Sequence, residues 1–149
     1  MRRVLHIIAL LLVVAISCGR SGEYTGYHEI KPSGWAYGDG LEYTVSVGDS
    51  MALRPMLLTL THDNSYNYSN LWIEVRYTER GGEVHVDTVN VEMCDVYGNW
   101  YGNGLPGHYQ LVDTLSRGPV SLADSSVVSV RHIMRVDTLT GISQIGIRY

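Results

Sequence analysis

The run CDVYGNWYGNG, residues 94–104, carries the residue types best suited to hold a ligand. Its three glycines would let a phosphate approach the backbone, and its aromatic side chains would stack on a sugar ring. A phosphate loop, however, opens a helix and usually carries a lysine. This run has no lysine and precedes no helical pattern. It therefore predicts a tight corner between two strands, with glycines at positive φ and Trp100 or Tyr101 covering the core.

A second spacing, in DNSYNYSNLWIE, is similar to that of a calcium-binding loop. Places 1, 3, 5, 7 and 12 of such a loop are held by Asp63, Ser65, Asn67, Ser69 and Glu74. The sharp turn at place 6 requires glycine, and the sequence has Tyr68 there. The flanks read as strands where helices are needed. We expect a polar connection between strands and no metal.

Histidines and serines provide no catalytic set. Beyond the first eighteen residues, no two histidines form the close pair typical of a zinc site. His132 shares the parity of Val130 and Met134, which predicts a hydrogen-bonded, half-buried imidazole. No serine lies in a Gly-x-Ser-x-Gly elbow. Whether two carboxylates meet in space is left open for the presumed loop residues Asp39, Asp49, Asp63 and Asp95. We expect neither catalysis nor a cofactor.

The aromatic residues are eleven tyrosines and three tryptophans, with no phenylalanine. Tyr and Trp carry a polar group, which suits them to half-exposed positions and binding faces. Trp72 is opposite in parity to Leu71 and Ile73, so it points either into a second packed layer or onto an exposed contact surface. Stacking of Trp35, Trp72 and Trp100 on sugars makes a glycan-binding module an alternative function.

The first eighteen residues, MRRVLHIIALLLVVAISC, have the pattern of a secretory signal peptide. Two arginines precede an apolar stretch that is shorter than the roughly 20 residues needed to cross a bilayer. The segment Ala15-Ile16-Ser17-Cys18 resembles a bacterial lipobox, with Ala15 where Leu is usual. We expect cleavage after residue 17 and acylation of Cys18 by palmitate-like chains, which anchor the protein in the lipid bilayer. Ordinary secretion with a free Cys18 thiol is the alternative.

The residues after Cys18 suggest which membrane is used. Gly19 follows the cysteine, where an inner-membrane retention signal resembles an Asp, and residues 19–22 carry no acidic cluster typical of surface export. We therefore expect the outer membrane, on its periplasm-facing leaflet. Loss of Arg2 and Arg3 with the signal peptide lowers the formal charge from −4 to −6. A chain this acidic is a poor partner for nucleic acid. Cys94 is then the remaining thiol, expected as a small buried hydrophobe.

The rest of the chain alternates with a period of two residues and predicts an antiparallel β-sandwich of about eight strands. One domain is expected at 35–149, after a signal peptide at 1–17 and a lipidated tether at 18–34. Predicted core-facing sets are Leu41, Tyr43, Val45 and Val47, then Leu71, Ile73, Val75 and Tyr77, then Val128, Val130 and Met134, and finally Ile145 and Ile147. RPMLLTLTHD predicts another strand, with Pro55 near an edge or bulge. Val84 and Val86 differ in parity from Val89, Val91 and Met93, which predicts a β-bulge or a strand junction at Asp87-Thr88.

Five motifs in order resemble the gliding-motility-associated lipoprotein family GldH. They are Tyr68-Ser69-Asn70-Leu71-Trp72-Ile73, Asp87-Thr88-Val89, Asp95-x-x-Gly98-x-Trp100-x-Gly102-x-Gly104, Met134-Arg135, and Leu139-x-Gly141-Ile142-x-x-x-Gly146-Ile147-Arg148. Met93-Cys94 departs from the usual Leu-Ala, and residues 121–126 lack the expected aromatic positions. The resemblance implies a non-enzymatic lipoprotein of the Bacteroidota gliding apparatus and its associated type IX secretion, or of envelope assembly more generally.

Two sets of site residues follow. The expected contact surface for other envelope lipoproteins or machinery proteins consists of Tyr68, Asn70, Trp72, Asp95, Trp100 and Tyr101, and a purely structural role is the alternative for these residues. By resemblance to Bacteroidota O-glycosylation sites, Asp-Ser/Thr-apolar triplets can carry a glycan on Ser50, Thr88, Thr114 and Thr138. A side chain that faces the core could not be modified.

Overall fold

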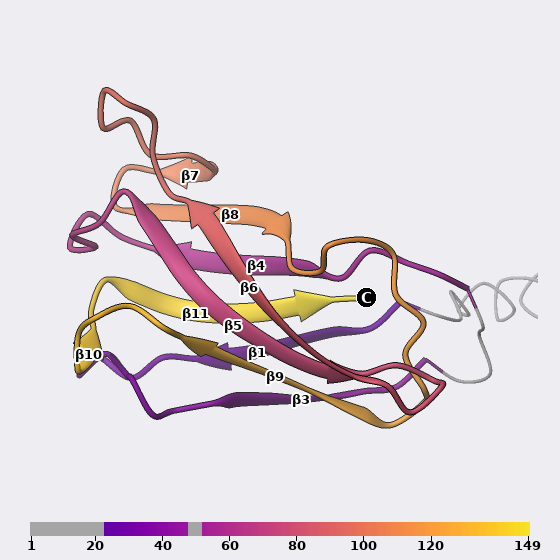
Figure 1. Cartoon of the computed structure of the whole chain (residues 1–149). Coiled ribbons are helices and arrows are strands. Elements are labelled where there is room, and N and C mark those ends of the chain that lie inside the picture. The colour runs from indigo at the N-terminus through magenta and orange to yellow at the C-terminus, as the bar shows by residue number, and fades with distance from the viewer. Residues whose placement is uncertain (1–22, 48–51) are drawn as a thin grey trace, which may run out of the picture.

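The computed structural model describes residues 23–47 and 52–149, and these residues form β-strands joined by loops and turns, without a helix (Figure 1). The predicted signal peptide and Cys18 lie outside the described residues, as does Ser50. β1 (Thr25–Glu29) falls within the range expected as a tether, and it pairs along its whole length with the last strand of the chain. The folded body therefore includes residues from Tyr24 onward.

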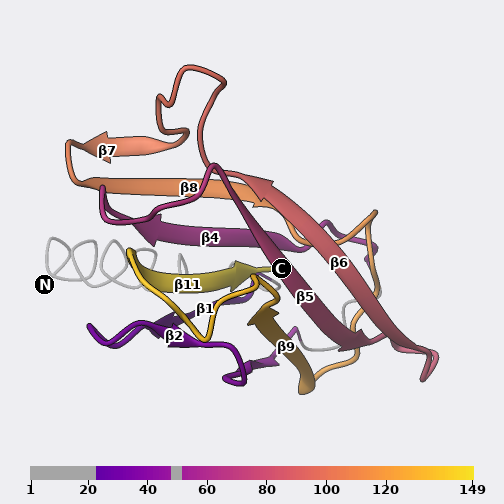
Figure 2. The same ribbon diagram turned by 60° about the vertical axis from the view of Figure 1, so that its left-hand side comes forward.

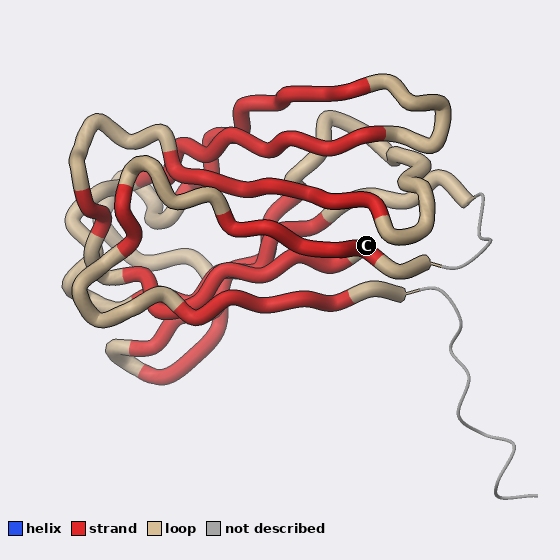
Figure 3. Tube along the Cα trace, turned by 90° about the horizontal axis from the view of Figure 1, so that it is seen from below, coloured by secondary structure: helices blue, strands red, loops and turns tan. Residues whose placement is uncertain are grey.

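Two antiparallel sheets lie face to face as a sandwich, confirming the predicted fold class (Figures 2 and 3). The five-stranded sheet has the order β1, β11 (Ile142–Arg148), β4 (Leu57–His62), β8 (His108–Thr114) and β7 (Asn103–Leu105). The four-stranded sheet has the order β3 (Leu41–Val45), β9 (Ser126–His132), β5 (Asn70–Thr78) and β6 (Val84–Glu92). β2 (Trp35–Ala36) and β10 (Thr138–Leu139) form a short separate pair.

The core lies between the two sheets and is built from the alternate residues that the sequence pattern indicates. Tyr43, Val45, Val128 and Val130 are buried, as are all four predicted residues of β5 and both of β11. Each strand turns its apolar side toward the other sheet because that burial is worth about 25 cal/mol per Å². A hydrogen bond also joins the sheets: the Tyr43 hydroxyl donates to the Ile145 carbonyl at 2.9 Å.

The β-bulge or strand junction predicted at Asp87-Thr88 is wrong in both forms. β6 pairs with β5 over nine consecutive residues in one unbroken register. Val84 and Val86 point outward and are 58% and 49% exposed. The inward positions at this end of β6 are instead His85 and Asp87. The alternation of valines therefore indicated the wrong inward side for this half of β6, because polar residues face the core here.

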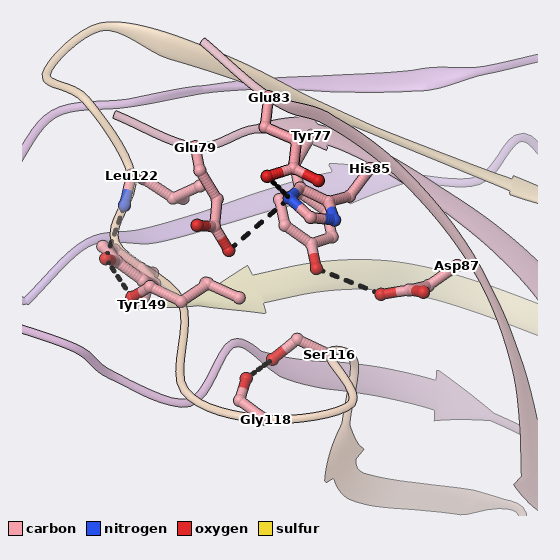
Figure 4. Close-up of polar contacts among 10 residues, drawn as sticks. Tyr77, Glu79, Glu83, His85, Asp87, Ser116, Gly118, Leu122 and Tyr149 are labelled. Atoms are coloured by element: carbon pink, nitrogen blue, oxygen red, sulfur yellow. Dashed lines mark hydrogen bonds and ion pairs between the residues drawn. The ribbon is translucent and has the colours of Figure 1, made fainter. Parts of the chain in front are cut away.

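Tyr77 of β5 explains why polar residues face inward at that end of β6. Its ring stacks on His85 with centroids 5.2 Å apart, and its hydroxyl donates to Asp87 Oδ2 at 3.0 Å (Figure 4). Burial and the Asp87 contact raise the pKa of Tyr77 to about 12, so the hydroxyl keeps its proton at physiological pH. His85 Nε2 lies 3.8 Å from Glu79 and 3.9 Å from Glu83. The pair of strands is therefore held by a polar cluster at this end.

The two ends of the described chain meet at the same end of the sandwich. Tyr24 and Tyr149 exchange two backbone hydrogen bonds, of 2.7 and 2.9 Å, which extend the pairing of β1 with β11. The Tyr149 hydroxyl donates to the Val120 carbonyl and accepts from the Leu122 amide (Figure 4). The last residue thus secures the connection between β8 and β9.

Gly141 lies at the opposite end, between β10 and β11. Its φ is +84°, and a Cβ there would lie 2.3 Å from the Tyr66 backbone nitrogen. Its carbonyl accepts a hydrogen bond from the Asp63 amide at 2.9 Å. A residue with a side chain would therefore push the turn at residues 63–66 away from β11.

Two histidines, His62 and His132, are fully buried within the sandwich. His132 was expected to be half-buried and hydrogen-bonded. Its Nε2 lies 3.0 Å from the Trp35 carbonyl, which confirms the hydrogen bond, but the ring is completely enclosed. Burial lowers the pKa of both imidazoles from the ordinary value of 6.5, against the raising effect of nearby backbone carbonyls. Both rings are therefore neutral in the folded protein at neutral pH.

Gly141→Ala should destabilise the fold more than Gly82→Ala, a matched control. Both glycines have a φ of +84°, but a Cβ at Gly82 meets no atom within 4 Å. The control should lose about 1–2 kcal/mol from backbone strain alone. Gly141→Ala should lose roughly a further 1–3 kcal/mol, because the neighbouring turn must move. Urea unfolding measures both losses, and equal losses would show that the close contact with Tyr66 is unimportant.

Stability should fall as pH is lowered through the buried histidines. The unfolded chain protonates His62 and His132 near pH 6.5, whereas the folded protein does so only at lower pH. Their contribution is therefore complete above pH 6.5 and is lost progressively below it. Urea midpoints between pH 7.5 and 5.5 should decrease, and His62→Gln should reduce that dependence. The exposed His108, changed to Gln, serves as the control, and an equal effect at both positions would contradict the assignment.

Candidate functional site

Residues 94–102 of the run lie in the loop between β6 and β7, and Asn103 and Gly104 begin β7, so the run is a corner between two strands as the sequence predicts. Asp95 organises its first turn: one carboxylate oxygen accepts from the amides of Tyr97 and Asn99 at 2.8 and 2.9 Å. The other oxygen accepts from the Asn99 side chain at 2.8 Å. These contacts, led by the Asn99 side chain, lower the pKa of Asp95. The carboxylate is thus engaged in holding the loop in one conformation.

Glycines in this loop have the positive φ that was expected. Gly98 has a φ of +83° and Gly102 a φ of +101°. A Cβ on Gly102 would lie 2.5 Å from the Gln110 carbonyl oxygen, so the loop packs directly on β8. The run leads into β7, a strand, and the phosphate-loop alternative is therefore excluded by its geometry.

Trp100 covers the end of the sandwich, which confirms that part of the prediction. Its ring is half-buried and lies 4.9 Å from the ring of His62 and 6.3 Å from those of Tyr66 and Tyr109. Its Nε1 donates to Asn64 Oδ1 at 3.1 Å. We name these rings, Trp100, His62, Tyr66 and Tyr109, the aromatic cap. It joins the loop at 94–104 to β4 and β8.

Cys94 forms an isolated bridge with Trp100 directly after β6. It was expected to be buried, but it is partly exposed. The reason is its parity: Met93 before it is completely buried, and Cys94 lies on the outward side with Asn90 and Glu92.

Val96 and Tyr97 occupy the tip of the loop and were not among the predicted contact residues. They are 93% and 87% exposed, the most exposed apolar side chains of the described part of the chain. The sequence contained a signal for them. Asp95 and Asn99 are turn-forming residues on either side, and side chains between them cannot reach the core.

Trp72 lies on the outer face of β5 and is 42% exposed, so the exposed alternative is correct. It lines a groove together with Tyr68 and four residues that follow β9, namely Ile133, Met134, Arg135 and Val136. The Trp72 backbone amide and carbonyl both engage this segment, through Met134 Sδ at 3.3 Å and the Ile133 amide at 2.9 Å. We call this the Trp72 groove.

Asn70, Asp95 and Tyr101 line a second, more polar depression beside the groove. The Asn70 side chain donates to Asn90 Oδ1 at 2.7 Å across β5 and β6. Five of the six predicted contact residues therefore lie in two neighbouring depressions on either side of the start of β5. Trp100 is the exception, since it belongs to the aromatic cap.

Glu74 follows Trp72 on the outer face of β5 and forms a two-pronged ion pair with Arg131 of β9. The distances are 2.9 and 3.0 Å, and the Arg131 hydrogen bonds lower the pKa of Glu74. Asp63 instead accepts from the Ser65 amide at 2.7 Å within its own turn. The two ends of the calcium-like spacing are therefore engaged in separate structural contacts. In residues 23–47 and 52–149, no three His, Cys, Asp or Glu side chains gather as metal ligands.

The described threonines of the Asp-Thr-apolar triplets all point outward. Thr88 lies in the middle of β6, Thr114 ends β8, and Thr138 begins β10, and each is exposed. None of the three faces the core, which was the condition for modification.

Within the described ranges, the structure has no helix with the length and apolar character needed to span a membrane.

Comparison with known proteins identifies similar chains over nearly the whole length. The gliding motility lipoprotein GldH of Flavobacterium johnsoniae is 24% identical over 148 residues, covering 95% of this chain and 92% of that protein. The gliding motility lipoprotein GldH homolog of Christiangramia forsetii is 24% identical, covering 95% of this chain and 91% of that protein.

Similarity to solved structures is weaker. The enzymatically active domain of tailspike protein 4 of bacteriophage CBA120 aligns with 87% of this chain and with 17% of its own. The TM-score is 0.27 and the identity 14%, values too low to bear on fold or function. The family comparison is specific by contrast, because residues 22–149 match the family described as GldH lipoprotein. This chain belongs to the GldH lipoprotein family.

Proposed function

We propose that this chain is a non-enzymatic lipoprotein that docks and assembles components of the gliding motility apparatus and its associated type IX secretion, or of the cell envelope. Family membership supports a lipoprotein of gliding motility, as its relatives are named. The observation that carries the docking role is Trp72. It stays exposed in a groove while its two neighbours in β5 are fully buried.

The polar side chains beside the groove also fit a docking surface better than a catalytic site. Asp95 is hydrogen-bonded within its own loop, Glu74 is paired with Arg131, and His62 is enclosed beneath Trp100. The two carboxylates are held by structural contacts, and the His62 ring is completely buried. Exposed Trp and Tyr side chains, in contrast, are enriched where proteins bind one another.

The position of the Trp72 groove suits a protein tethered by its N-terminus, because the ring of Tyr68 in the groove lies 5.7 Å from the ring of Tyr66 in the aromatic cap. The described chain starts beside Tyr149, at the end of the sandwich where β11 finishes. The aromatic cap lies at the other end, since Tyr66 contacts both Trp100 and Gly141. The seven residues of β11 separate these ends by roughly 20 Å at the rise of an antiparallel strand. A membrane anchor at Cys18 would leave the cap facing away from the bilayer.

A glycan-binding surface lipoprotein is the second candidate. The exposed Trp72 ring provides a stacking platform, and Arg135 and the Asn70 and Asn90 amides lie in or beside the groove. Stacking of an aromatic ring with nearby hydrogen-bond donors suits a sugar. A protein partner is favoured here because the apolar residues Ile133, Met134 and Val136 also line the groove.

Trp72→Ala should abolish specific capture without unfolding the protein. Tagged wild-type and variant chains would be recovered from native membranes, and their captured proteins compared quantitatively. Trp72→Ala should lose most of the specifically captured protein while its melting temperature stays within a few degrees, because the ring is half exposed. Val112→Ala, an exposed residue on the outer face of the other sheet, should behave as wild type.

The comparison with Trp100→Ala separates docking from packing. Removing this ring from the aromatic cap should cost about 2–4 kcal/mol of stability, which would reduce capture by unfolding the corner. Unchanged capture by Trp72→Ala would contradict the docking surface. Loss of sugar binding in a titration, with unchanged protein capture, would favour the glycan-binding candidate.

Acylation of Cys18 and the outer-membrane location are tested by the intact mass and the fractionation of protein from its own host. The wild type should carry fatty-acyl mass and stay in the outer-membrane fraction, shielded from protease added to intact cells. Cys18→Ala should be unacylated and released from the membrane. The intact mass would also show any glycan on Ser50, Thr88, Thr114 or Thr138, which we propose as modification sites. An unacylated wild type, or digestion on intact cells, would contradict the anchor or its face.

A further inference from the structure

The edge formed by β6 carries an inference beyond the Trp72 groove. β6 closes one side of the four-stranded sheet and pairs with β5 along all nine of its residues. No described strand pairs with its other side. The remaining edge strands of the two main sheets are shorter: β1 and β3 have five residues each, and β7 has three. β6 is therefore the longest open edge among the described strands.

The direction of the backbone groups on β6 follows from its neighbour. The Trp72 amide and carbonyl point toward the β9 side, so the alternate residues of β5 bond to β6. These are the odd-numbered residues of β5, from Leu71 to Tyr77. They pair with the odd-numbered residues of β6, which are His85, Asp87, Val89 and Val91. The even-numbered residues of β6, from Val84 to Glu92, consequently present their amides and carbonyls to the open edge.

This edge lacks most of the features that prevent pairing with another chain, and the one feature that it has is the inward-pointing acid Asp87. Edge strands are normally short, bulged, or blocked by Lys or Pro. β6 reads VHVDTVNVE, contains neither residue, and keeps a regular register. Asp87, one of its two acidic residues, accepts a hydrogen bond from Tyr77 and lies 3.4 Å from Arg117 Nε. Its charge is thus partly compensated within the same molecule.

We propose that β6 pairs with β6 of a second copy of this chain, in an antiparallel register centred on Thr88. The two four-stranded sheets would then form one continuous sheet across a two-fold axis. Thr88 is the middle residue of Val84–Glu92, so this register uses every residue of the strand. Shifting the centre by two residues, to Val86 or Asn90, leaves four residues of each strand unpaired.

The side chains are compatible with this register. Val84 lies opposite Glu92 of the second copy, and Val86 lies opposite its Asn90. On the inner side, Asp87 lies opposite Val89 of the second copy, and His85 lies opposite its Val91. No two like charges are directly opposed. The two Asp87 carboxylates are diagonal neighbours, each with its own Arg117 nearby, and the central Thr88 pair is of a type that stabilises antiparallel strands. An acidic chain can therefore pair with itself along this edge.

Cross-linking tests the register directly. The full chain carrying Cys94→Ser and Thr88→Cys, in detergent, would be treated with a short thiol-reactive cross-linker. Thr88→Cys should give a covalent dimer, because the two central Cα atoms would be about 5.5 Å apart. Thr114→Cys, at another exposed threonine, on β8, is the matched control and should remain monomeric. The protein comes from a host that adds no glycan, since a glycan on Thr88 would compete with pairing.

Edge-blocking variants test the affinity. Sedimentation of the full chain in detergent should show a dimer at about 100 μM, and Val86→Lys should raise the Kd about tenfold or more. Thr88→Pro should act likewise, since its outward amide makes no bond to β5. Val112→Lys is the control for an added charge elsewhere. A monomeric wild type, equal cross-linking at both threonines, or a dimer unaffected by Val86→Lys would each overturn the proposal, and none of these outcomes bears on capture through Trp72.

Discussion

The two-residue period of β5 determines what the rest of this molecule can do. Leu71, Ile73 and Val75 are completely buried between the sheets, and their burial dictates the orientation of the whole strand. Trp72 and Glu74 must then point outward, because a strand cannot turn neighbouring residues to the same side. The exposed tryptophan, its groove and the Glu74–Arg131 ion pair all result from that one constraint. A shift of register would bury the outer face and expose the core.

Residues of the family motifs form contacts between segments that are distant in sequence. Gly141 approaches the turn that carries Tyr66, Gly102 packs on the carbonyl of Gln110, and Trp100 covers His62. These contacts involve four separate parts of the chain and meet around the aromatic cap. The glycines are required because another backbone occupies the space of their missing side chains. The motif pattern therefore describes how one end of the sandwich is closed.

Much of the fold could be predicted from the sequence, because alternating hydrophobic residues identify both a strand and its buried side. This succeeded for β3, β5, β9 and β11. It failed at β6, where the inward His85 and Asp87 depend on Tyr77, a partner that no local pattern reveals. It also could not show that residues 25–29 pair with the last strand, since that pairing spans nearly the entire chain. Of the site, the outward direction of Trp72 followed from parity, whereas the opposite wall of its groove comes from the segment after β9.

The antiparallel pairing of β1 with β11 has a mechanical consequence. β1 is the first described strand, and all five of its residues pair with β11. The hydrogen bonds of this antiparallel pair run perpendicular to the two strands. If the chain before β1 were pulled while the opposite end of the sandwich was held, the force would run along β1. All of its hydrogen bonds to β11 would then be loaded together in shear, and they would not break one after another. A pull on the N-terminal side of β1 would therefore not separate this strand from β11 one hydrogen bond at a time.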